Sequence, residues 1–185
     1  PAPICVGQSA TLTASGGTNY IWNTGSTSAT INVSPATTTT YTVTVTNANG
    51  CSATASGTVT VNPLPTPSVS APAPICVGQS ATLTASGGTN YQWNTGANTA
   101  SITVSPGSTT TYTVTVTNAN GCSATASGTV TVNPLPTPSV SAPAPICVGQ
   151  SATLTASGGT NYQWNTGANT ASITVSPGST TTYTV

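Results

Sequence analysis

The chain repeats itself with a period of 71 residues, and this repetition limits its fold more than any other feature. The segment that begins at Pro1 begins again at Pro72 and at Pro143, and the second and third copies are identical over the 43 residues they share. The first copy differs from the second only between Ile21 and Thr37. A unit of this length has the size of a small domain. The sequence therefore predicts one domain used repeatedly in a tandem array.

The expected domain boundaries follow the repeat. We expect a first domain at residues 1–63, which lacks the leading linker and edge strand of the other copies. A second domain at residues 64–134 includes a proline-rich linker, and a third at residues 135–185 is truncated before its last strand. The interrupted third copy predicts that this sequence is a window on a longer repetitive protein.

Apolar and polar residues alternate along each copy with a period of two, which is typical of strands with one buried face. Turn residues, such as Asn-Ala-Asn-Gly at Asn47–Gly50, separate the alternating runs and favour hairpins. Short strands with such frequent turns predict an antiparallel β-sandwich. In the first copy the expected core residues are Leu12, Trp22, Ile31, Val33, Tyr41, Val43, Val45, Val59 and Val61, and Ala53 and Ala55 are expected to point inward with them.

The linker between copies contains prolines at positions 63, 65, 67, 72 and 74. Prolines at this density favour an extended, polyproline-like backbone, so we expect a semi-rigid spacer. The segment Ser68–Ala71 in its middle is a candidate for the first edge strand of the following domain.

The chain has no Lys, Arg, Asp, Glu or His, and its formal net charge is zero. Binding to nucleic acid depends on cationic side chains that neutralise phosphates, so this class of partner is excluded. The chain has no cationic side chain that an anionic membrane surface could attract. No run of about 18 apolar residues is present, so we expect no insertion into a membrane.

The same composition argues against an enzyme. General acid–base catalysis needs His, Asp, Glu or Lys, and a Cys or Tyr nucleophile needs a neighbouring base. Calcium sites need carboxylates, and one cysteine at each sandwich edge is not a zinc site. We therefore expect no catalytic, metal-binding or cofactor-binding residues.

Several motifs together resemble a known family of repeats. They are Cys-x-Gly-x-Ser-x-Thr-Leu-Thr-Ala at Cys5–Ala14, Tyr-x-Trp at Tyr20–Trp22, the run Tyr41–Cys51 and the proline-rich exit. As a set they resemble the tandem immunoglobulin-like or PKD-like repeats of long secreted surface proteins of the Bacteroidetes. The resemblance implies an all-β tandem array of immunoglobulin-like antiparallel β-sandwich domains, which serves as a stalk or spacer in an extracellular adhesin or filament exported by a type IX route. Members of that family generally carry acidic and basic residues, whereas this chain has none.

The five cysteines predict a disulfide in each complete repeat. In an immunoglobulin-like sandwich the first and last strands run parallel and start from the same end, so we expect Cys5 to pair with Cys51 and Cys76 with Cys122. Such a bridge stabilises a small domain by about 4 kcal/mol. Cys147 would then have its partner beyond the chain end. The alternative pairing, Cys51 with Cys76, would clamp the linker instead.

The leading functional hypothesis is a structural repeat of an extracellular fibre or adhesin stalk. We expect the chain to associate with further copies of itself into a filament, or to continue in a longer repetitive chain. The alternative is a carbohydrate-binding or cell-adhesion module with an aromatic platform at Tyr20 and Trp22, although the Trp of the third strand usually lies in the core of a sandwich. Tyr41, at the start of the expected next-to-last strand, resembles the tyrosine of the tyrosine corner found in immunoglobulin-like domains. A flat ice-binding array along Thr40, Thr42, Thr44 and Thr46 is disfavoured because sandwich sheets twist.

Glycans are the remaining candidate partners, because an uncharged surface needs another source of solubility. Candidate O-glycan positions are the hydroxyl runs Thr37, Thr38, Thr39, Thr40 and Ser108, Thr109, Thr110, Thr111. Either function places the chain outside the cell or on its surface.

The stability of the folded chain should scarcely depend on pH, because linkage acts only through groups that bind protons differently in the folded and unfolded states. Only the termini, tyrosines and free thiols titrate in this sequence. Between about pH 3 and pH 8 the unfolding midpoint of the oxidised, unmodified chain should therefore stay nearly constant, with little effect of salt. Thermal unfolding followed by circular dichroism measures this, and a shift of more than about 5 °C contradicts it.

Overall fold

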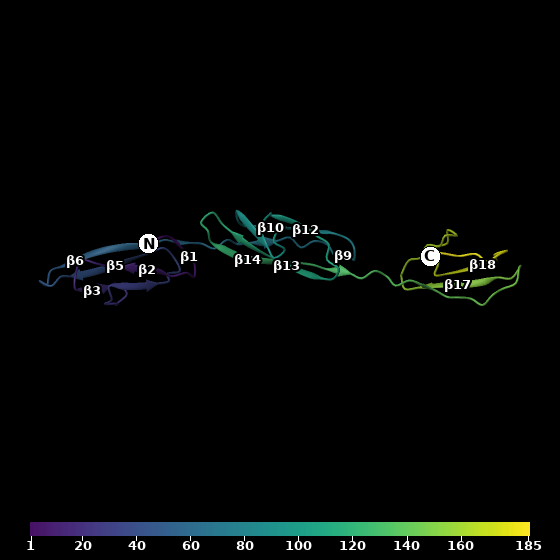
Figure 1. Ribbon diagram of the computed structural model, residues 1–185, viewed down its shortest axis with the longest axis horizontal. Coiled ribbons are helices and arrows are strands. Elements are labelled where there is room, and N and C mark those ends of the chain that lie inside the picture. The colour runs from purple at the N-terminus through teal and green to yellow at the C-terminus, as the bar shows by residue number, and fades with distance from the viewer. The chain divides into compact units, whose positions relative to one another are not determined.

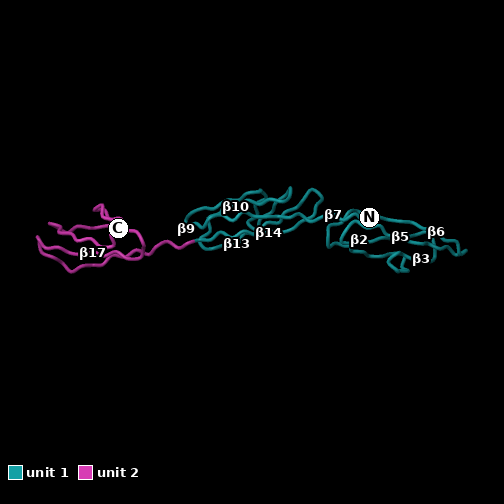
Figure 2. The backbone as a smooth tube through the Cα atoms, turned by 180° about the vertical axis from the view of Figure 1, so that it is seen from behind, with its two compact units in different colours: residues 1–132 teal, residues 133–185 magenta.

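A computed structural model describes all 185 residues, which form strands and turns but no helix (Figure 1). The chain divides into two compact units, residues 1–132 and residues 133–185 (Figure 2). The first unit contains repeats 1 and 2, and each of the three repeats has a hydrophobic cluster of its own.

The chain has eighteen strands, and those of repeat 1 recur in the same order in repeat 2. Repeat 1 has β1 (Ile4–Cys5), β2 (Ala10–Thr13), β3 (Asn19–Trp22), β4 (Thr30–Val33), β5 (Thr39–Thr46), β6 (Ser52–Val59) and β7 (Val61–Asn62). Repeat 2 has β8 (Ser68–Val69), β9 (Ile75–Cys76), β10 (Ala81–Ser86), β11 (Asn90–Trp93), β12 (Ser101–Val104), β13 (Thr110–Thr117), β14 (Ser123–Val130) and β15 (Val132–Asn133). Repeat 3 has β16 (Ser139–Val140), β17 (Ala152–Ser157) and β18 (Ser172–Val175).

Repeat 2 shows the complete strand arrangement. One sheet has the order β12-β10-β8 and the other the order β11-β13-β14, and all the strand pairs within them are antiparallel. β9 and β15 form an additional pair. Of these six strands, the first, second and fourth in chain order form one sheet and the third, fifth and sixth form the other, which is the arrangement of an immunoglobulin-like sandwich. The prediction of an all-β tandem array of such domains is confirmed.

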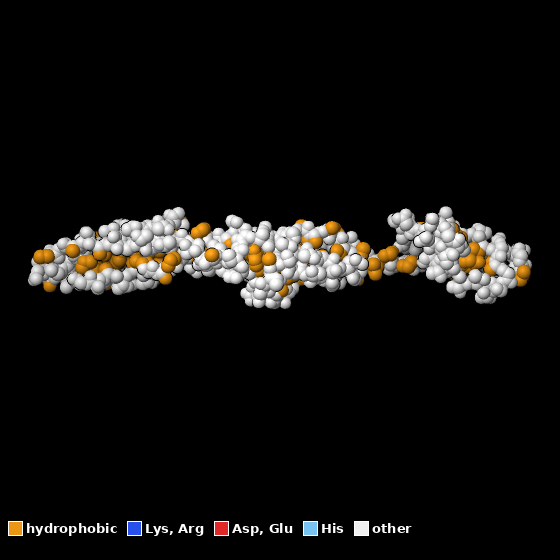
Figure 3. Space-filling view, turned by 90° about the horizontal axis from the view of Figure 1, so that it is seen from above, with side chains coloured by type: hydrophobic (Ala, Val, Ile, Leu, Met, Phe, Trp, Pro, Cys, Tyr) orange, Lys and Arg blue, Asp and Glu red, His pale blue; other side chains and the backbone are white.

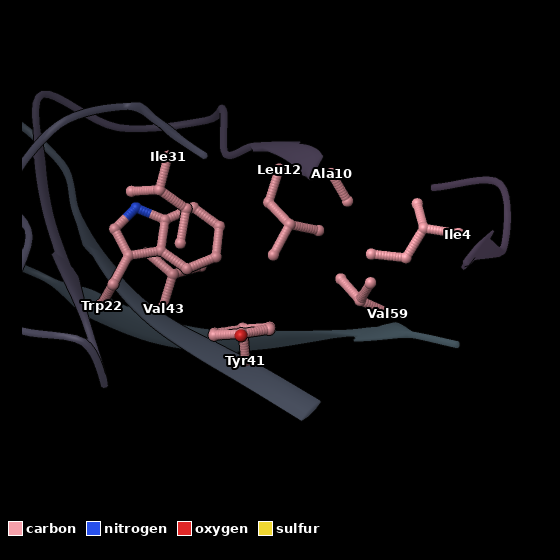
Figure 4. Packing of buried hydrophobic residues seen from close by; sticks show 8 residues of the cluster. All are labelled: Ile4, Ala10, Leu12, Trp22, Ile31, Tyr41, Val43 and Val59. Carbon is pink, nitrogen blue, oxygen red and sulfur yellow. The ribbon is translucent and has the colours of Figure 1, made fainter. Parts of the chain in front are cut away.

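The period-two alternation decides which side chains enter the core. Figure 4 shows the buried cluster of repeat 1, in which the Trp22 ring lies beside Ile31 and Val43, and Ile4 and Val59 lie near each other at the opposite end. The expected core residues Leu12, Trp22, Ile31, Tyr41, Val43 and Val59 are buried, and Val33, Val45 and Val61 are partly buried against them.

The outward faces of the sheets are covered by hydroxyl groups. On the pair β5·β6, Thr40 and Thr58 share a hydrogen bond of 2.9 Å between their hydroxyls, and Thr46 and Ser52 share one of 2.8 Å. Such cross-strand pairs stabilise a sheet modestly. The space-filling view shows no charged group among these polar side chains, and hydrophobic atoms are visible between them (Figure 3).

Replacing Leu12 by Ala should lower the free energy of unfolding of repeat 1 by about 2–5 kcal/mol, because a buried leucine leaves a cavity. The exposed Thr42 on the outward face provides the control, since Thr42→Ala should change it by less than about 0.5 kcal/mol. Hydrogen exchange measured by mass spectrometry resolves the effect, because peptides covering residues 21–37 differ in sequence from those of repeats 2 and 3. Equal exchange in the two variants would contradict the prediction.

Candidate functional site: the junction between repeats 1 and 2

A disulfide joins the first two repeats. Cys5, at the end of β1 in repeat 1, is bonded to Cys122, which precedes β14 in repeat 2, with 5.6 Å between their Cα atoms and 117 residues between them in sequence. The bond therefore encloses nearly the whole of both repeats in one covalent loop.

The predicted pairings Cys5–Cys51 and Cys76–Cys122 are wrong, and the register of the first strand gives the reason. β1 does run parallel to the end of the last strand, but Cys5 lies opposite Asn62 in β7. Cys51 precedes the start of β6, eleven residues before Asn62. An extended chain of that length covers about 35 Å, whereas disulfide-bonded Cα atoms lie within about 7 Å of each other. The two cysteines of one repeat thus lie at opposite ends of its sandwich.

The turn before Cys122 is organised around Asn118. Its Oδ1 accepts hydrogen bonds from the backbone N–H of Asn120 (3.0 Å) and of Cys122 (3.1 Å). Its Nδ2 donates to the carbonyl oxygen of Pro63, at 3.0 Å, in the linker that leaves repeat 1. One side chain therefore shapes the hairpin of repeat 2 and also holds the exit of repeat 1.

The junction also buries apolar atoms. Cys122 is only 1% exposed, and its Sγ lies 3.9 Å from the carbonyl oxygen of Asn62; a bonded sulfur has no hydrogen to donate, so this is a packing contact. Pro65 in the linker is buried as well. Cys51 occupies the position in repeat 1 that corresponds to Cys122 and is exposed, although its turn has the same hydrogen bonds from Asn49 and Cys51 to Asn47 Oδ1. The burial of Cys122 thus comes from the neighbouring repeat and not from its own hairpin.

The three remaining cysteines, Cys51, Cys76 and Cys147, are exposed and unpaired. The alternative pairing of Cys51 with Cys76 is therefore also absent. Cys76 lies in β9, which is paired with β15, whereas no strand is formed at Cys147.

The aromatic platform proposed for carbohydrate binding is not formed. Trp22 is 5% exposed, and its Nε1 donates to the carbonyl oxygen of Ser28 at 2.8 Å. Tyr20 packs against the same core, and its hydroxyl donates to the carbonyl oxygen of Gly17 at 2.8 Å. In a tyrosine corner the tyrosine hydroxyl bonds to the backbone a few residues upstream. Tyr20 forms a bond of this kind, whereas the hydroxyl of Tyr41, for which the sequence predicted it, does not. The sequence did not separate the two tyrosines because both lie on inward positions of neighbouring strands.

The candidate glycan positions differ in the state of their hydroxyls. Thr38 and Thr109 accept hydrogen bonds from the N–H groups of Val61 and Val132. Thr39, Thr40, Thr110 and Thr111 also use their hydroxyls within the fold. Among the eight positions only Thr37 and Ser108, both exposed, keep hydroxyls without a hydrogen-bonding partner.

The structure holds no group of three or more side chains suited to bind a metal ion. It also contains no helix with the length and hydropathy needed to cross a bilayer. The junction brings together groups that lie far apart in sequence, since Cys5 and Cys122 are 117 residues apart.

No family model and no curated protein matches the chain. Among solved structures it is similar to the three N-terminal domains of the highly immunogenic outer capsid protein of bacteriophage RB49, with 20% identity over 84% of this chain and 65% of that one and a TM-score of 0.40. It is also similar to a Ca²⁺-stabilized adhesin of an Antarctic bacterium that binds ice (16% identity, 92% of this chain, 60% of that one, TM-score 0.36). A third is the N-terminal eight immunoglobulin domains of the Down syndrome cell adhesion molecule (16%, 89%, 28%, 0.33).

The chain spans less than two thirds of the length of each of these three structures. At such identities and TM-scores the similarities carry no argument about function. The fold assignment rests on the strand order, and the resemblance to Bacteroidetes surface repeats stays a prediction.

The disulfide assignment predicts the number of free thiols. The oxidised, denatured chain should react with three equivalents of a thiol reagent, because Cys51, Cys76 and Cys147 are free. The variant Cys122→Ser should release Cys5 and react with four, whereas Cys51→Ser should react with two. Variants are needed because the sequences around Cys51 and Cys122 are identical, so peptide mapping does not separate a bond of Cys5 to Cys51 from a bond of Cys5 to Cys122. A count of two for Cys122→Ser would contradict the assignment.

Proposed function

We propose that this chain is a non-catalytic structural array, a stiff extracellular stalk or spacer whose successive repeats are locked together by disulfides. The observation that carries the proposal is the Cys5–Cys122 bond between repeats. A binding module needs no covalent link between neighbouring domains, whereas a spacer gains a fixed junction from one. The residue types that catalysis requires are absent from the sequence.

Tension along the chain would pass through the disulfide instead of through the two sandwiches. A force that enters at residue 5 and leaves at residue 122 crosses one covalent bond, so the strands between them carry no load once that bond is taut. Asn118 adds a hydrogen bond across the same junction. This arrangement suits a repeat that must keep its length under load.

The disulfide favours an extracellular location, which fits this role. Disulfides persist in oxidising compartments and are rare in the cytosol. A surface without charges has no electrostatic repulsion between neighbouring arrays, so lateral or end-to-end self-association into a filament follows unless glycans at Thr37 and Ser108 cover it. Glycans attached at these two hydroxyls are therefore the expected partners of the surface.

The same pairing is expected to recur along an array of these repeats. Each cysteine at the position of Cys5 would bond to the hairpin cysteine of the next repeat, 117 residues later, as Cys5 does. Cys76 and Cys147 hold this position in repeats 2 and 3. From strands of about eight residues and extended linkers, we expect an axial spacing on the order of 40 Å per repeat.

Pulling single molecules from their two ends tests the load-bearing role. The oxidised chain should reach a contour length about 400 Å shorter than the reduced chain, because the 117 residues between Cys5 and Cys122 stay enclosed. Cys5→Ser should restore the full length in the absence of reductant, and Cys51→Ser should keep the shorter one. Equal lengths for the oxidised chain and Cys5→Ser would overturn the proposal.

A further inference from the structure

Repeat 2 has a polar hollow on the outward face of the sheet β11-β13-β14. The hollow has a volume of about 350 Å³, and its lining includes Asn90 and Gln92 of β11, Thr115 and Thr117 of β13, and Asn98 of the loop that follows β11. In the antiparallel register Asn90 lies opposite Thr117 and Gln92 lies opposite Thr115. Three amides and two hydroxyls therefore line one space.

The amides of the hollow take no part in holding the fold together. The side chains of Asn90, Gln92 and Asn98 are exposed and form no hydrogen bond within the chain. In contrast, Asn94 and Asn118 of the same repeat accept hydrogen bonds from backbone N–H groups. An amide that is bonded only to water can exchange this water for the polar groups of a ligand.

The position of Asn98 is fixed by the buried side chain of Trp93. The Trp93 Nε1 donates to the carbonyl oxygen of Thr99 at 2.9 Å, and the backbone N–H of Trp93 donates to that of Ala97 at 2.8 Å. Asn98 lies between these two anchored residues, so a constrained part of the loop presents it. A ligand that contacts Asn98 loses little free energy in ordering this loop.

The natural differences between the repeats include this hollow. Repeat 1 has Ile21 at the position of Gln92 and Thr27 at the position of Asn98, whereas repeat 3 has the same residues as repeat 2. Ile21 is 60% exposed, and its side chain has no hydrogen-bonding group. The equivalent asparagines and glutamine of repeat 3 also line a hollow. Repeats with the same strand order thus differ in the polar groups that they present at this place.

We propose that the hollow of repeat 2 is a binding site for a neutral saccharide. An amide has both a donor and an acceptor, as a sugar hydroxyl does, so Gln92 and Asn98 form paired hydrogen bonds with hydroxyls of the sugar. No charged side chain is present to compensate a carboxylate, sulfate or amino group, so a charged sugar would lose hydration without gaining a partner. The volume falls within the range of about 300–1,000 Å³ that is typical of ligand sites.

An extended peptide fits the hollow less well than a saccharide does. Peptides add to a sheet by pairing with the backbone of an edge strand, whereas this hollow offers side-chain groups on the face of a sheet. The one aromatic residue in its lining is Tyr91, whose hydroxyl already donates to the carbonyl oxygen of Gly88 at 2.9 Å. A ligand therefore gains more from hydrogen bonds than from apolar burial, which favours a sugar.

The site adds a second role to a structural array. A single open and polar hollow binds weakly, but several hollows along one chain bind a polymeric saccharide more strongly than any one of them does. The inference does not depend on the load-bearing role of the disulfide, because failure to bind sugars would leave the contour-length result unchanged.

Binding of the full 185-residue chain to immobilised polymers tests the proposal. The chain is used without attached glycans and is labelled with a fluorophore at its free thiols. The array holds neutral glucans, mannans, galactans and xylans beside uronic-acid polymers, sulfated polymers and uncharged peptides. Saturable binding to at least one neutral polysaccharide is expected. Absence of such binding, or binding to the charged polymers or the peptides that is as strong or stronger, overturns the proposal.

The chain supplies matched substitutions that place the binding in the hollow. Gln92→Ile, Asn98→Thr, Gln163→Ile and Asn169→Thr together give repeats 2 and 3 the residues of repeat 1, whose sandwich folds with them. This fourfold variant should bind the neutral polysaccharide about tenfold more weakly or less, because the hydrogen bonds of both amides are lost. Unchanged binding would mean that the saccharide lies elsewhere and would contradict the proposal.

Two further variants separate the hollow from other differences between the repeats. Thr103→Asn with Thr174→Asn also makes repeats 2 and 3 like repeat 1, but on β12 and β18, outside the hollow, and should leave binding unchanged. Ile21→Gln with Thr27→Asn gives repeat 1 the two amides and should raise the number of oligosaccharides bound per chain, measured by isothermal titration calorimetry. Loss of binding in the first variant, or no gain in the second, contradicts the assignment of the site.

Discussion

The parallel pairing of β1 with β7 is the contact on which the junction depends. It places Ile4 opposite Val61 and Cys5 opposite Asn62, so the first strand lies beside the very end of the last one. Ile4 then closes one end of the core of repeat 1, and Cys5 lies where the chain leaves for repeat 2. A shift of this pairing toward the start of β6 would bring Cys5 to its own hairpin and leave the next repeat without a covalent partner.

Identical sequence in different surroundings separates local from tertiary effects in this molecule. Cys51 and Cys122 follow the same turn with the same hydrogen bonds, yet only Cys122 has a neighbouring repeat and is buried. Val45 and Val116 differ in the same way, because repeat 2 has the edge strand β8 and repeat 1 forms no equivalent strand. In both comparisons the backbone of the hairpin forms without the neighbour, and the neighbour decides what is covered.

The absence of charge leaves few interactions to hold the fold. Apolar burial, backbone pairing and hydroxyl hydrogen bonds such as that between Thr40 and Thr58 remain, and none of these involves a charged group. No buried side-chain polar atom lacks a hydrogen-bonding partner, which matters because such an atom would cost free energy with nothing to offset it. The surface can therefore be uniform and uncharged while the core and the junction carry the specificity.

The sequence by itself determined the strands, their buried faces and the sandwich, because period-two alternation and turn residues act over short distances. Leu12 and Trp22 were recognisable as inward from that pattern alone. The partner of Cys5 and the tyrosine that bonds back to the backbone were decided only by the tertiary structure. Alternation fixes the face of a strand but not its stagger against a strand far away in sequence, and the stagger of β1 decides which repeat Cys5 reaches.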